Sequence, residues 1–199
     1  MLSYPSIPSW KGSVLGEPCI AFYKYDGSNL RWEWSPKKGW YKYGTRNHLF
    51  DGTHIPYNQA IPYFYDVMAD DIVREVVEDQ GRKPERIVAF TEFFGPSSFA
   101  GTHDETEEKE LVLFDVSVYK KGFYPARKFV KMFNQYPFMA DVVYEGNMNM
   151  PFIHDIQNSK YAVYEGVVCK GDGWNAKIKT NTYLERLKGK FGNDWEKYE

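Results

Sequence analysis

The chain has 199 residues, 43% of them hydrophobic and 26% charged, which is ordinary for a globular domain with a buried core. Its formal charge of −2 at pH 7 excludes a global electrostatic field that would draw the chain onto nucleic acid, so any such binding needs local basic patches. The sequence contains neither an apolar run of membrane-spanning length nor an amino-terminal signal, so we expect no membrane partner.

The first half of the chain predicts strands and tight turns. Residues 20–25 read as an apolar strand, and residues 30–34 alternate apolar and charged side chains, as a half-buried strand does. A turn over 36–39 leads to a partner strand over 40–43. The first helix is expected over 71–80, with Ile72, Val73, Val76 and Val77 on its buried face, an Asp as its cap and Gly81 at its end.

The second half continues with strands and two further helices. Strands are predicted over 87–94 and 110–119, separated by a polar loop over 101–109, and again over 161–170 and 176–180. Pro125 is expected to open a helix that buries Phe129, Val130 and Phe133, and a closing helix with Tyr183, Leu184 and Leu187 is expected to stop near Gly189.

The order of these elements indicates a fold class. Strands lie together with few helices between them, which favours an α+β fold of antiparallel sheets flanked by helices. No internal repeat, low-complexity tract or change of composition marks a linker. We therefore assign residues 1–199 to a single domain.

Five short motifs follow one another along the chain and carry its candidate chemistry. In the first, residues 24–29, Lys24 ends a strand just before a turn in which Gly27 permits the close approach of a ligand. A lysine amine becomes nucleophilic when burial or neighbouring cations disfavour its charged form. A surface lysine before a turn is the alternative. The other motifs are Thr91-Glu92-Phe93-Phe94-Gly95, Leu113-Phe114-Asp115-Val116, Glu165-Gly166-Val167-Val168 and Lys177-Ile178-Lys179.

Lys177 and Lys179 form a pair of cations on one predicted strand. Because they are two residues apart, both side chains point to the same face while Ile178 points into the core. Adjacent ammonium groups repel each other unless an anion neutralises them, and a triphosphate is a suitable anion. A solvated strand face remains the alternative for this pair.

Two glutamates and one ring complete the set. Glu165 and Glu92 each stand beside a predicted strand end, and carboxylates near a triphosphate are expected to hold a metal or a sugar hydroxyl. Each is also compatible with an ordinary salt bridge. Phe114 is a candidate base-stacking ring, although its position equally suits a core residue.

Together and in this order, the motifs resemble those of the covalent nucleotidyltransferase superfamily of ATP-dependent ligases and mRNA capping enzymes. The chain is most similar to the RNA ligase 2-like group, in which an Asn follows the Gly-Ser/Thr pair, as Asn29 does, and an arginine corresponds to Arg46. The resemblance spans residues 20–180. It implies the nucleotidyltransferase (ATP-grasp-like) fold of polynucleotide ligases.

The resemblance also implies an activity. Lys24 would attack the α-phosphate of ATP and form lysyl-AMP, while Lys177 and Lys179 stabilise the charge that develops on the phosphate. The AMP would pass to a 5′-phosphate of RNA, and a 3′-hydroxyl would displace it and join the ends. The further implied roles are Arg46 at the sugar or phosphate of the bound end, Glu92 at the ribose, Phe114 on adenine, Asn29 at the phosphate or a metal-bound water, Tyr23 at the nucleotide, and Glu165 with Asp26 at Mg²⁺ or Mn²⁺.

Two departures from the superfamily pattern bear on the substrate. Only 20 residues follow Lys179, so we expect no appended OB-fold or C-terminal helical domain, and a protein partner could supply one. Asn29 stands where DNA ligases and capping enzymes carry an arginine, with Arg31 further along. RNA is therefore the expected substrate, with DNA possible. The alternatives are a DNA nick-sealing ligase, a GTP-dependent capping guanylyltransferase, and a catalytically silent nucleic-acid-binding module.

The remaining polar residues give weaker signals. His48, His54, His103 and His154 have no ligand spacing, so no zinc site is predicted. Cys19 and Cys169 make no disulfide framework, which favours a reducing, cytoplasmic location, and Cys169 is expected to be buried and inert. Candidate basic patches, each also compatible with a solvated surface, are Arg127-Lys128-Lys131, Lys120-Lys121 and Arg186-Lys188-Lys190.

Overall fold

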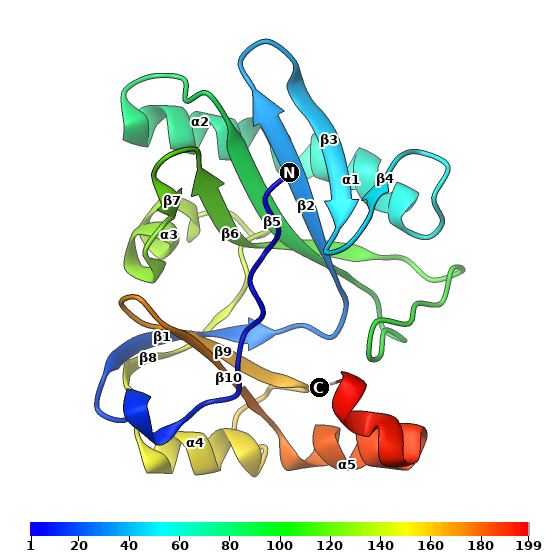
Figure 1. The fold of residues 1–199 in the computed structure, drawn as a ribbon, viewed down its shortest axis with the longest axis vertical. Helices are drawn as coiled ribbons and strands as arrows, with labels where there is room; N and C mark the ends of the chain where they lie inside the picture. The colour runs from blue at the N-terminus through cyan, green and yellow to red at the C-terminus, as the bar shows by residue number, and fades with distance from the viewer. Residues whose placement is uncertain (199) are drawn as a thin grey trace. The chain divides into compact units, whose positions relative to one another are not determined.

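The computed structural model describes residues 1–198, which contacts divide into two compact units. The first unit contains residues 1–5, 27–98 and 102–139, and the second contains residues 6–26, 99–101 and those from 140 onward. Each unit is built on one antiparallel sheet flanked by helices (Figure 1), so the predicted α+β class is confirmed. The assignment of the chain to a single catalytic domain stays a prediction.

The sheet of the first unit has six strands in the order β4-β3-β2-β5-β6-β7, all antiparallel to their neighbours. The expected strands over 30–34, 40–43, 87–94 and 110–119 are confirmed within it. The strands are β2 (Ser28–Ser35), β3 (Gly39–Thr45), β4 (Leu49–Phe50), β5 (Ile87–Phe94), β6 (Glu110–Val118) and β7 (Gly122–Phe123).

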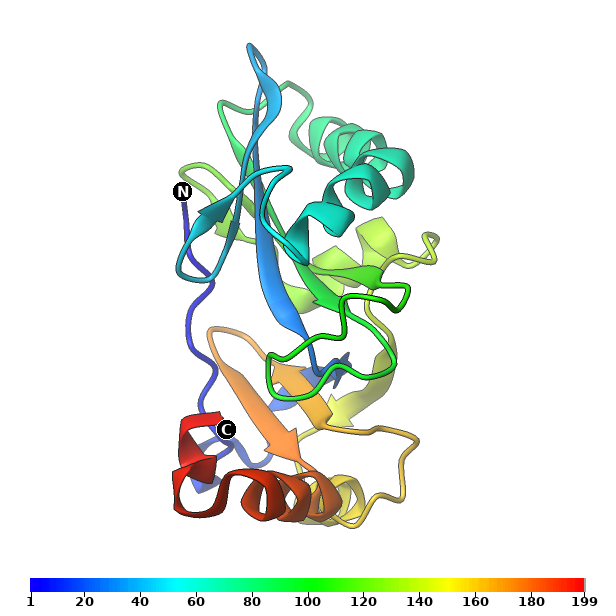
Figure 2. The same ribbon diagram turned by 90° about the vertical axis from the view of Figure 1, so that its right-hand side faces the viewer.

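Helices cover one face of this sheet. Trp32 of β2 stacks on Phe64 of α1 (Ala60–Val67) with ring centroids 4.0 Å apart, and the Trp40 indole donates to the Ala69 carbonyl at the start of α2 (Ala69–Gln80). Figure 2 shows α1, α2 and α3 (Ala126–Phe133) on this side of the sheet. Tyr57–Gln59 is a short 3-10 helix that leads into α1.

The predicted ends of the helices are partly correct. Gly81 ends α2 in the left-handed conformation, with a φ of 66°, as expected. The expected Asp cap is wrong, because α2 begins after Met68, and Asp70 and Asp71 lie in its first turn, where their charges favour the positive end of the helix. In α3, Phe129 and Phe133 are buried as predicted, with Met132 rather than Val130 as the third buried side chain.

The other face of the six-stranded sheet is covered by the first residues of the chain, which Figure 2 shows opposite the helices. The Arg31 guanidinium donates to the carbonyls of Met1 and Leu2, at 3.2 and 3.1 Å, and Tyr4 packs on Phe90. Arg31 and Glu33 are therefore only 6% and 2% exposed. The prediction that this strand is half-buried is wrong because alternating charges here face a second buried layer.

The sheet of the second unit has four strands in the order β10-β9-β1-β8. Its strands are β1 (Pro18–Lys24), β8 (Val142–Asn147), β9 (Gly166–Lys170) and β10 (Asn175–Lys179), and its helices are α4 (Met150–Gln157), α5 (Asn181–Phe191) and the short 3-10 helices Gly12–Val14 and Gly192–Tyr198. Ala21, Val167 and Ile178 pack with Phe152 and Ile153 of α4 to form the core on one face.

Two predicted boundaries in this unit differ from the structure. The strand expected over 161–170 begins only at Gly166, because residues 161–165 form a loop. The closing helix passes through Gly189 and ends at Gly192, which has a φ of 54°. Among residues 1–198 no helix is both long and apolar enough to cross a membrane.

Candidate active site

Three neighbouring strands of the second unit bring two predicted lysines into one row. In the strand register Lys24 of β1 pairs with Gly166 of β9, and Gly166 pairs with Lys179 of β10. Gly166 has a φ of 149°, and a Cβ atom on it would lie 2.0 Å from the Ile178 carbonyl oxygen. The glycine of the fourth motif is thus required by the close approach of β10 to β9.

The carboxylate of Glu165 joins the two amines. Glu165 Oε1 lies 2.9 Å from Lys24 Nζ and 2.8 Å from Lys179 Nζ. The side chains of Glu165 and Lys179 are only 4% exposed, whereas that of Lys24 is 25% exposed. Glu165 is therefore the shared partner of two cations, of which Lys24 is the more exposed. Such buried charges are retained only when they are well paired.

Asp26 adds a second negative charge beside this group. Its Oδ1 accepts a 2.8 Å hydrogen bond from the Ala100 backbone, while its Oδ2 is buried with no hydrogen-bond partner among residues 1–198. Burial raises the pKa of Asp26, and the charge of Glu165 raises it further, against the opposing effects of the Ala100 N–H, the Tyr183 hydroxyl and Lys24. An unsatisfied carboxylate oxygen of this kind suits a cation or a ligand hydroxyl.

Lys177 and Tyr23 take different positions in the same sheet. Lys177 shares the strand face of Lys179, as predicted, and is half-buried opposite Val168. Tyr23 points to the opposite face of β1 from Lys24, against the core with α4, and its hydroxyl accepts a 3.1 Å hydrogen bond from the Tyr164 N–H. Burial, and then the charge of Glu165, raises the pKa of Tyr23. Tyr23 thereby supports the loop that presents Glu165, and its predicted contact with the nucleotide stays a prediction.

The first unit brings other predicted residues onto its polar face. Asn29 of β2 and Glu92 of β5 are directly paired in the strand register, so their side chains are neighbours on one face. The Asn29 Oδ1 atom is buried and has no hydrogen-bond partner among residues 1–198. An amide oxygen without a partner beside a carboxylate is a candidate for accepting hydrogen bonds from the hydroxyls of a ligand or from a water molecule.

Phe114 lies at an irregularity in the same sheet. The register between β5 and β6 shifts so that Thr91 pairs with Leu113 and Phe90 with Asp115, which leaves Phe114 as the extra residue of a β-bulge. Bulges commonly re-aim a side chain next to a functional site. The ring is half-buried and makes an edge contact with Tyr4, at 5.0 Å between centroids, so it is neither plain core nor fully exposed.

Tyr4 connects Phe114 with two charged residues. Its hydroxyl donates a 2.9 Å hydrogen bond to Asp115 Oδ2, and burial, reinforced by the charge of Asp115, raises the pKa of Tyr4. The positive charge of Arg46 acts in the opposite direction and lowers the pKa of Tyr4. Arg46 itself is exposed, and its backbone carbonyl accepts a hydrogen bond from Ser3.

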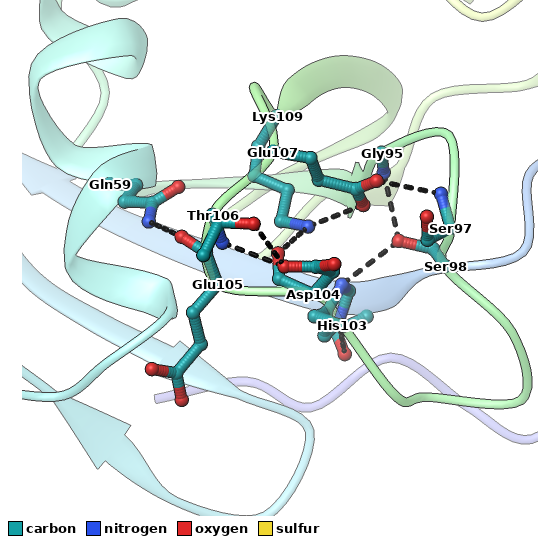
Figure 3. Close-up of polar contacts among 11 residues, drawn as sticks. Gln59, Gly95, Ser97, Ser98, His103, Asp104, Glu105, Thr106, Glu107 and Lys109 are labelled. Carbon is teal, nitrogen blue, oxygen red and sulfur yellow. Dashed lines mark hydrogen bonds and ion pairs between the residues drawn. The ribbon is translucent and has the colours of Figure 1, made fainter.

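The loop that follows β5 is held by its own polar side chains (Figure 3). Lys109 Nζ pairs with Glu107 Oε1 at 2.6 Å and also donates to the Asp104 carbonyl, and Glu107 accepts from the Ser97 N–H. His103 bridges the loop to the start of β2, because its ring nitrogens lie 3.0 Å from Ser98 Oγ and 2.8 Å from Ser28 Oγ. Burial, with a further effect of Lys109, lowers the pKa of His103 to about 4.

Gly27 immediately precedes β2. A glycine is required at this position for a structural reason that the sequence did not indicate. A Cβ atom on Gly27 would lie 2.3 Å from the Phe93 carbonyl oxygen. The glycine of the first motif is therefore required by the approach of β5, in addition to any ligand. The chain passes from the second unit to the first between Asp26 and Gly27.

Sequence reasoning missed several residues around these groups. Tyr183 of α5 lies under Lys179, whose Nζ is 4.8 Å from the ring centroid, and burial, then the charges of Glu165 and Asp26, raise the pKa of the Tyr183 hydroxyl. No local motif marks Tyr183 or Tyr4, since their partners lie far away in the sequence. Ser28, inside the first motif and beside Asn29, was the one local clue to the contact with His103.

The arrangement of the second unit has a definite chemical capacity. It presents a partly exposed amine, a second buried amine and two carboxylates within one network. No group of three or more His, Cys, Asp or Glu side chains that could hold a metal forms within residues 1–198. A metal at Asp26 and Glu165 would therefore need further oxygens from a ligand.

Comparison with known proteins supports this fold. No protein-family model matches the chain, and no curated protein matches it. Solved structures of Naegleria gruberi RNA ligase do match: one with PPi gives a TM-score of 0.60 at 19% identity over 89% of this chain, and mutants with ATP and Mn give 0.59 at 18% over 87% and 0.62 at 15% over 93%.

The matches cover only part of each ligase chain. The chain spans about half the length of those ligase chains, 53% of two of them and 58% of the third. At this identity the likeness concerns the fold. The chain has the nucleotidyltransferase fold of RNA ligases, as the order of the motifs predicted.

Proposed function

We propose that this chain is an ATP-dependent RNA ligase, or the adenylyltransferase part of one, with Lys24 as its nucleophile. The observation that carries the proposal is the ion-pair group in which Glu165 Oε1 holds both Lys24 Nζ and Lys179 Nζ, at 2.9 and 2.8 Å. Residues from three distant motifs meet there around the one amine that is partly exposed. The RNA ligase fold of the chain, and neighbours solved with ATP, Mn and PPi, support the same activity.

The first step would transfer AMP to the protein. Lys24 Nζ would give up a proton, for which Glu165 Oε1 lies within hydrogen-bond distance, and attack the α-phosphorus of ATP. The new P–N bond would form as the bond to pyrophosphate breaks. Lys179, with Lys177 on the same strand face, would neutralise charge on the α-phosphate, and preorganised cations of this kind stabilise phosphoryl transfer.

The later steps would join two ends. An oxygen of an RNA 5′-phosphate would displace Lys24 from the AMP, and a 3′-hydroxyl would then attack that 5′-phosphorus and release AMP. We assign Glu92 to the ribose hydroxyls, Asn29 to the phosphate or a metal-bound water, Phe114 to the adenine ring, and Arg46 to the sugar or phosphate of the bound end. The resemblance of the motifs implies these assignments, and the pairing of Asn29 with Glu92 and the bulge at Phe114 are consistent with them.

A divalent metal, Mg²⁺ or Mn²⁺, is part of this proposal. Mg²⁺ is typically held by one or two protein carboxylates together with substrate phosphates, which fits the unpartnered Asp26 Oδ2 beside Glu165. When bound, the metal would neutralise phosphate charge. We expect Mn²⁺ to raise the melting temperature of the wild-type protein more than that of Asp26→Asn, which can be measured without ATP. Equal shifts of the melting temperature in the two proteins would show that Asp26 does not bind the metal.

Labelling with radioactive nucleotide tests the proposed nucleophile. We expect a covalent adduct from ATP labelled at the α-phosphate, and no adduct from Lys24→Ala or Lys24→Arg. A matched control is Lys160→Ala in the same unit, because Lys160 is an exposed lysine that also pairs with a carboxylate, Asp155, at 2.7 Å. Full labelling of Lys24→Ala would contradict the assignment.

The same assay separates the alternatives. A capping guanylyltransferase would form the adduct from GTP instead of ATP, and a silent binding module would form none. Offering nicked and single-stranded RNA and DNA with 5′-phosphates to the adenylated protein then distinguishes an RNA ligase from a DNA ligase.

A further inference from the structure

The surface of α5 carries two cations that the sequence had placed in a larger basic patch. Arg186 and Lys190 are exposed and one helical turn apart, so they share a face of the helix. The Arg186 guanidinium lies 4.0 Å, and Lys190 Nζ 4.8 Å, from the centroid of the Phe99 ring, which is 1% exposed. A buried ring thus holds two positive charges side by side at the surface.

These two side chains differ from the other predicted basic patches in their ion pairing. Within residues 1–198 no carboxylate forms an ion pair with Arg186 or Lys190. The other predicted patches differ, because Lys128 pairs with Asp79 at 2.7 Å and Lys120 lies 3.7 Å from Glu85. In a chain whose formal charge is −2, the α5 cations are therefore a local site for an anionic partner.

Contacts within the second unit connect these cations with the candidate active site. Lys179 Nζ lies over the Tyr183 ring, and that ring contacts Phe99 at 5.5 Å between centroids. Arg186 also lies 5.6 Å from the centroid of Tyr164, which immediately precedes Glu165. Tyr164 is 41% exposed, whereas Glu165 is 3% exposed.

We propose that Tyr164, Arg186 and Lys190, here called the α5 surface, bind a single-stranded RNA that carries its 5′-phosphate toward Lys24. The inference rests on the proposed function and names where the strand is held. Proteins bind single strands by combining cations that follow the phosphates with exposed rings on which bases stack. Arg186 and Lys190 supply the cations, and Tyr164, which immediately precedes Glu165, supplies an exposed ring.

Lys188 provides a matched control on the same helix. It lies between the two cations in the sequence but on another face, with its Nζ 4.7 Å from the Trp195 ring. If the whole helix attracted RNA by its charge alone, Lys188 would contribute to binding as much as Arg186 and Lys190. If RNA binds at the α5 surface, Lys188 does not contribute.

Fluorescence anisotropy with a labelled, 5′-phosphorylated single-stranded RNA tests the surface on the full chain without ATP. We expect the Arg186→Ala/Lys190→Ala variant to bind roughly tenfold more weakly at low salt, and the slope of log affinity against log salt to fall by about 1.4, for two lost phosphate contacts. Tyr164→Ala should weaken binding about tenfold with the salt slope kept, because stacking is uncharged, and Tyr164→Phe should bind as the wild type does.

Three results would overturn the inference: no RNA binding by the wild type, wild-type affinity in the double variant, or an equal loss in Lys188→Ala. Melting curves check that each variant is folded, and Lys190→Ala alone at its exposed position tests the surface if the double variant is not. Failure of the proposed function would look different, since Lys24 would then take no label from ATP although RNA still binds.

Discussion

The polar faces of the two sheets contain the same kinds of charged residues but neutralise them differently. On the six-stranded sheet, Arg31 is satisfied by backbone carbonyls of the first residues and Asp115 accepts from Tyr4, so the chain itself covers the charges. On the four-stranded sheet, Glu165 pairs with two lysines, one of them a quarter exposed.

The difference shows where ligand chemistry can take place. On the six-stranded sheet, hydrogen bonds to backbone carbonyls and from a tyrosine hydroxyl satisfy the charged side chains within the chain. An ion pair between side chains, in contrast, can be exchanged for an ion pair with a ligand. The nucleophile that we propose, Lys24, lies in the second unit, and the first unit contains the bulged ring of Phe114 and the buried Asn29 amide oxygen.

Removing the shared carboxylate is the strongest test of this contrast. Glu165→Gln leaves the buried Lys179 without its counter-charge, and losing one partner of a buried pair costs about 3–5 kcal/mol of unfolding free energy. Urea denaturation measures this cost. Glu85→Gln is the matched control, because Glu85 and Lys120 are both 71% exposed, and its effect should stay within about 0.5 kcal/mol. Equal effects would mean that the Glu165 group is as solvated as a surface pair.

The row of three strands gives the second test. Gly166→Ala would put a Cβ atom 2.0 Å from the Ile178 carbonyl oxygen at a φ of 149°, so we expect a loss of about 3 kcal/mol or more. Gly189→Ala is its control, since that glycine lies inside α5 with nothing within 4 Å, and it should stabilise the chain by about 0.5–1 kcal/mol. Urea denaturation of both variants measures the two changes in the free energy of unfolding. If Gly166→Ala is as stable as the wild type, β9 and β10 can move apart to accept the Cβ atom.

How much of this could be read from the sequence depends on the range of each interaction. Strands such as β5 were predictable because Ile87–Phe94 has a local apolar pattern, whereas β8 was missed because Glu145, Gly146 and Asn147 interrupt it. The meeting of Lys24, Glu165 and Lys179 was expected from the order of motifs. The contacts of Tyr4 with Asp115 were not, because they link residues 111 positions apart and leave no local pattern.

Tyr4 allows a smaller test, on the sheet whose charges the chain covers. Tyr4→Phe keeps the ring contact with Phe114 but removes the O–H donor to Asp115, and a hydrogen bond to a charged group contributes about 1.5–3 kcal/mol. Tyr144→Phe removes a tyrosine hydrogen bond of the same length, 2.9 Å, at an exposed site, and should cost less. Thermal and urea unfolding of both variants gives the difference. If Tyr144→Phe lowers the free energy of unfolding as much as Tyr4→Phe does, water reaches Asp115 as easily as it reaches the surface.

The last expected effect concerns pH and the loop after β5. His103 has a folded pKa of about 4 against an ordinary value of 6.5, because burial disfavours its charged form. Between these values the unfolded chain binds the proton and the folded chain does not, so stability should fall as pH decreases from about 6.5 to 4 and lose this dependence below 4. NMR titration of the imidazole measures the folded pKa directly, and His103→Gln should remove this part of the pH dependence, whereas His48→Gln at an exposed position should not. A His103 transition above pH 6 would mean that the loop admits water, and that the first unit, too, carries a titratable group open to ligands.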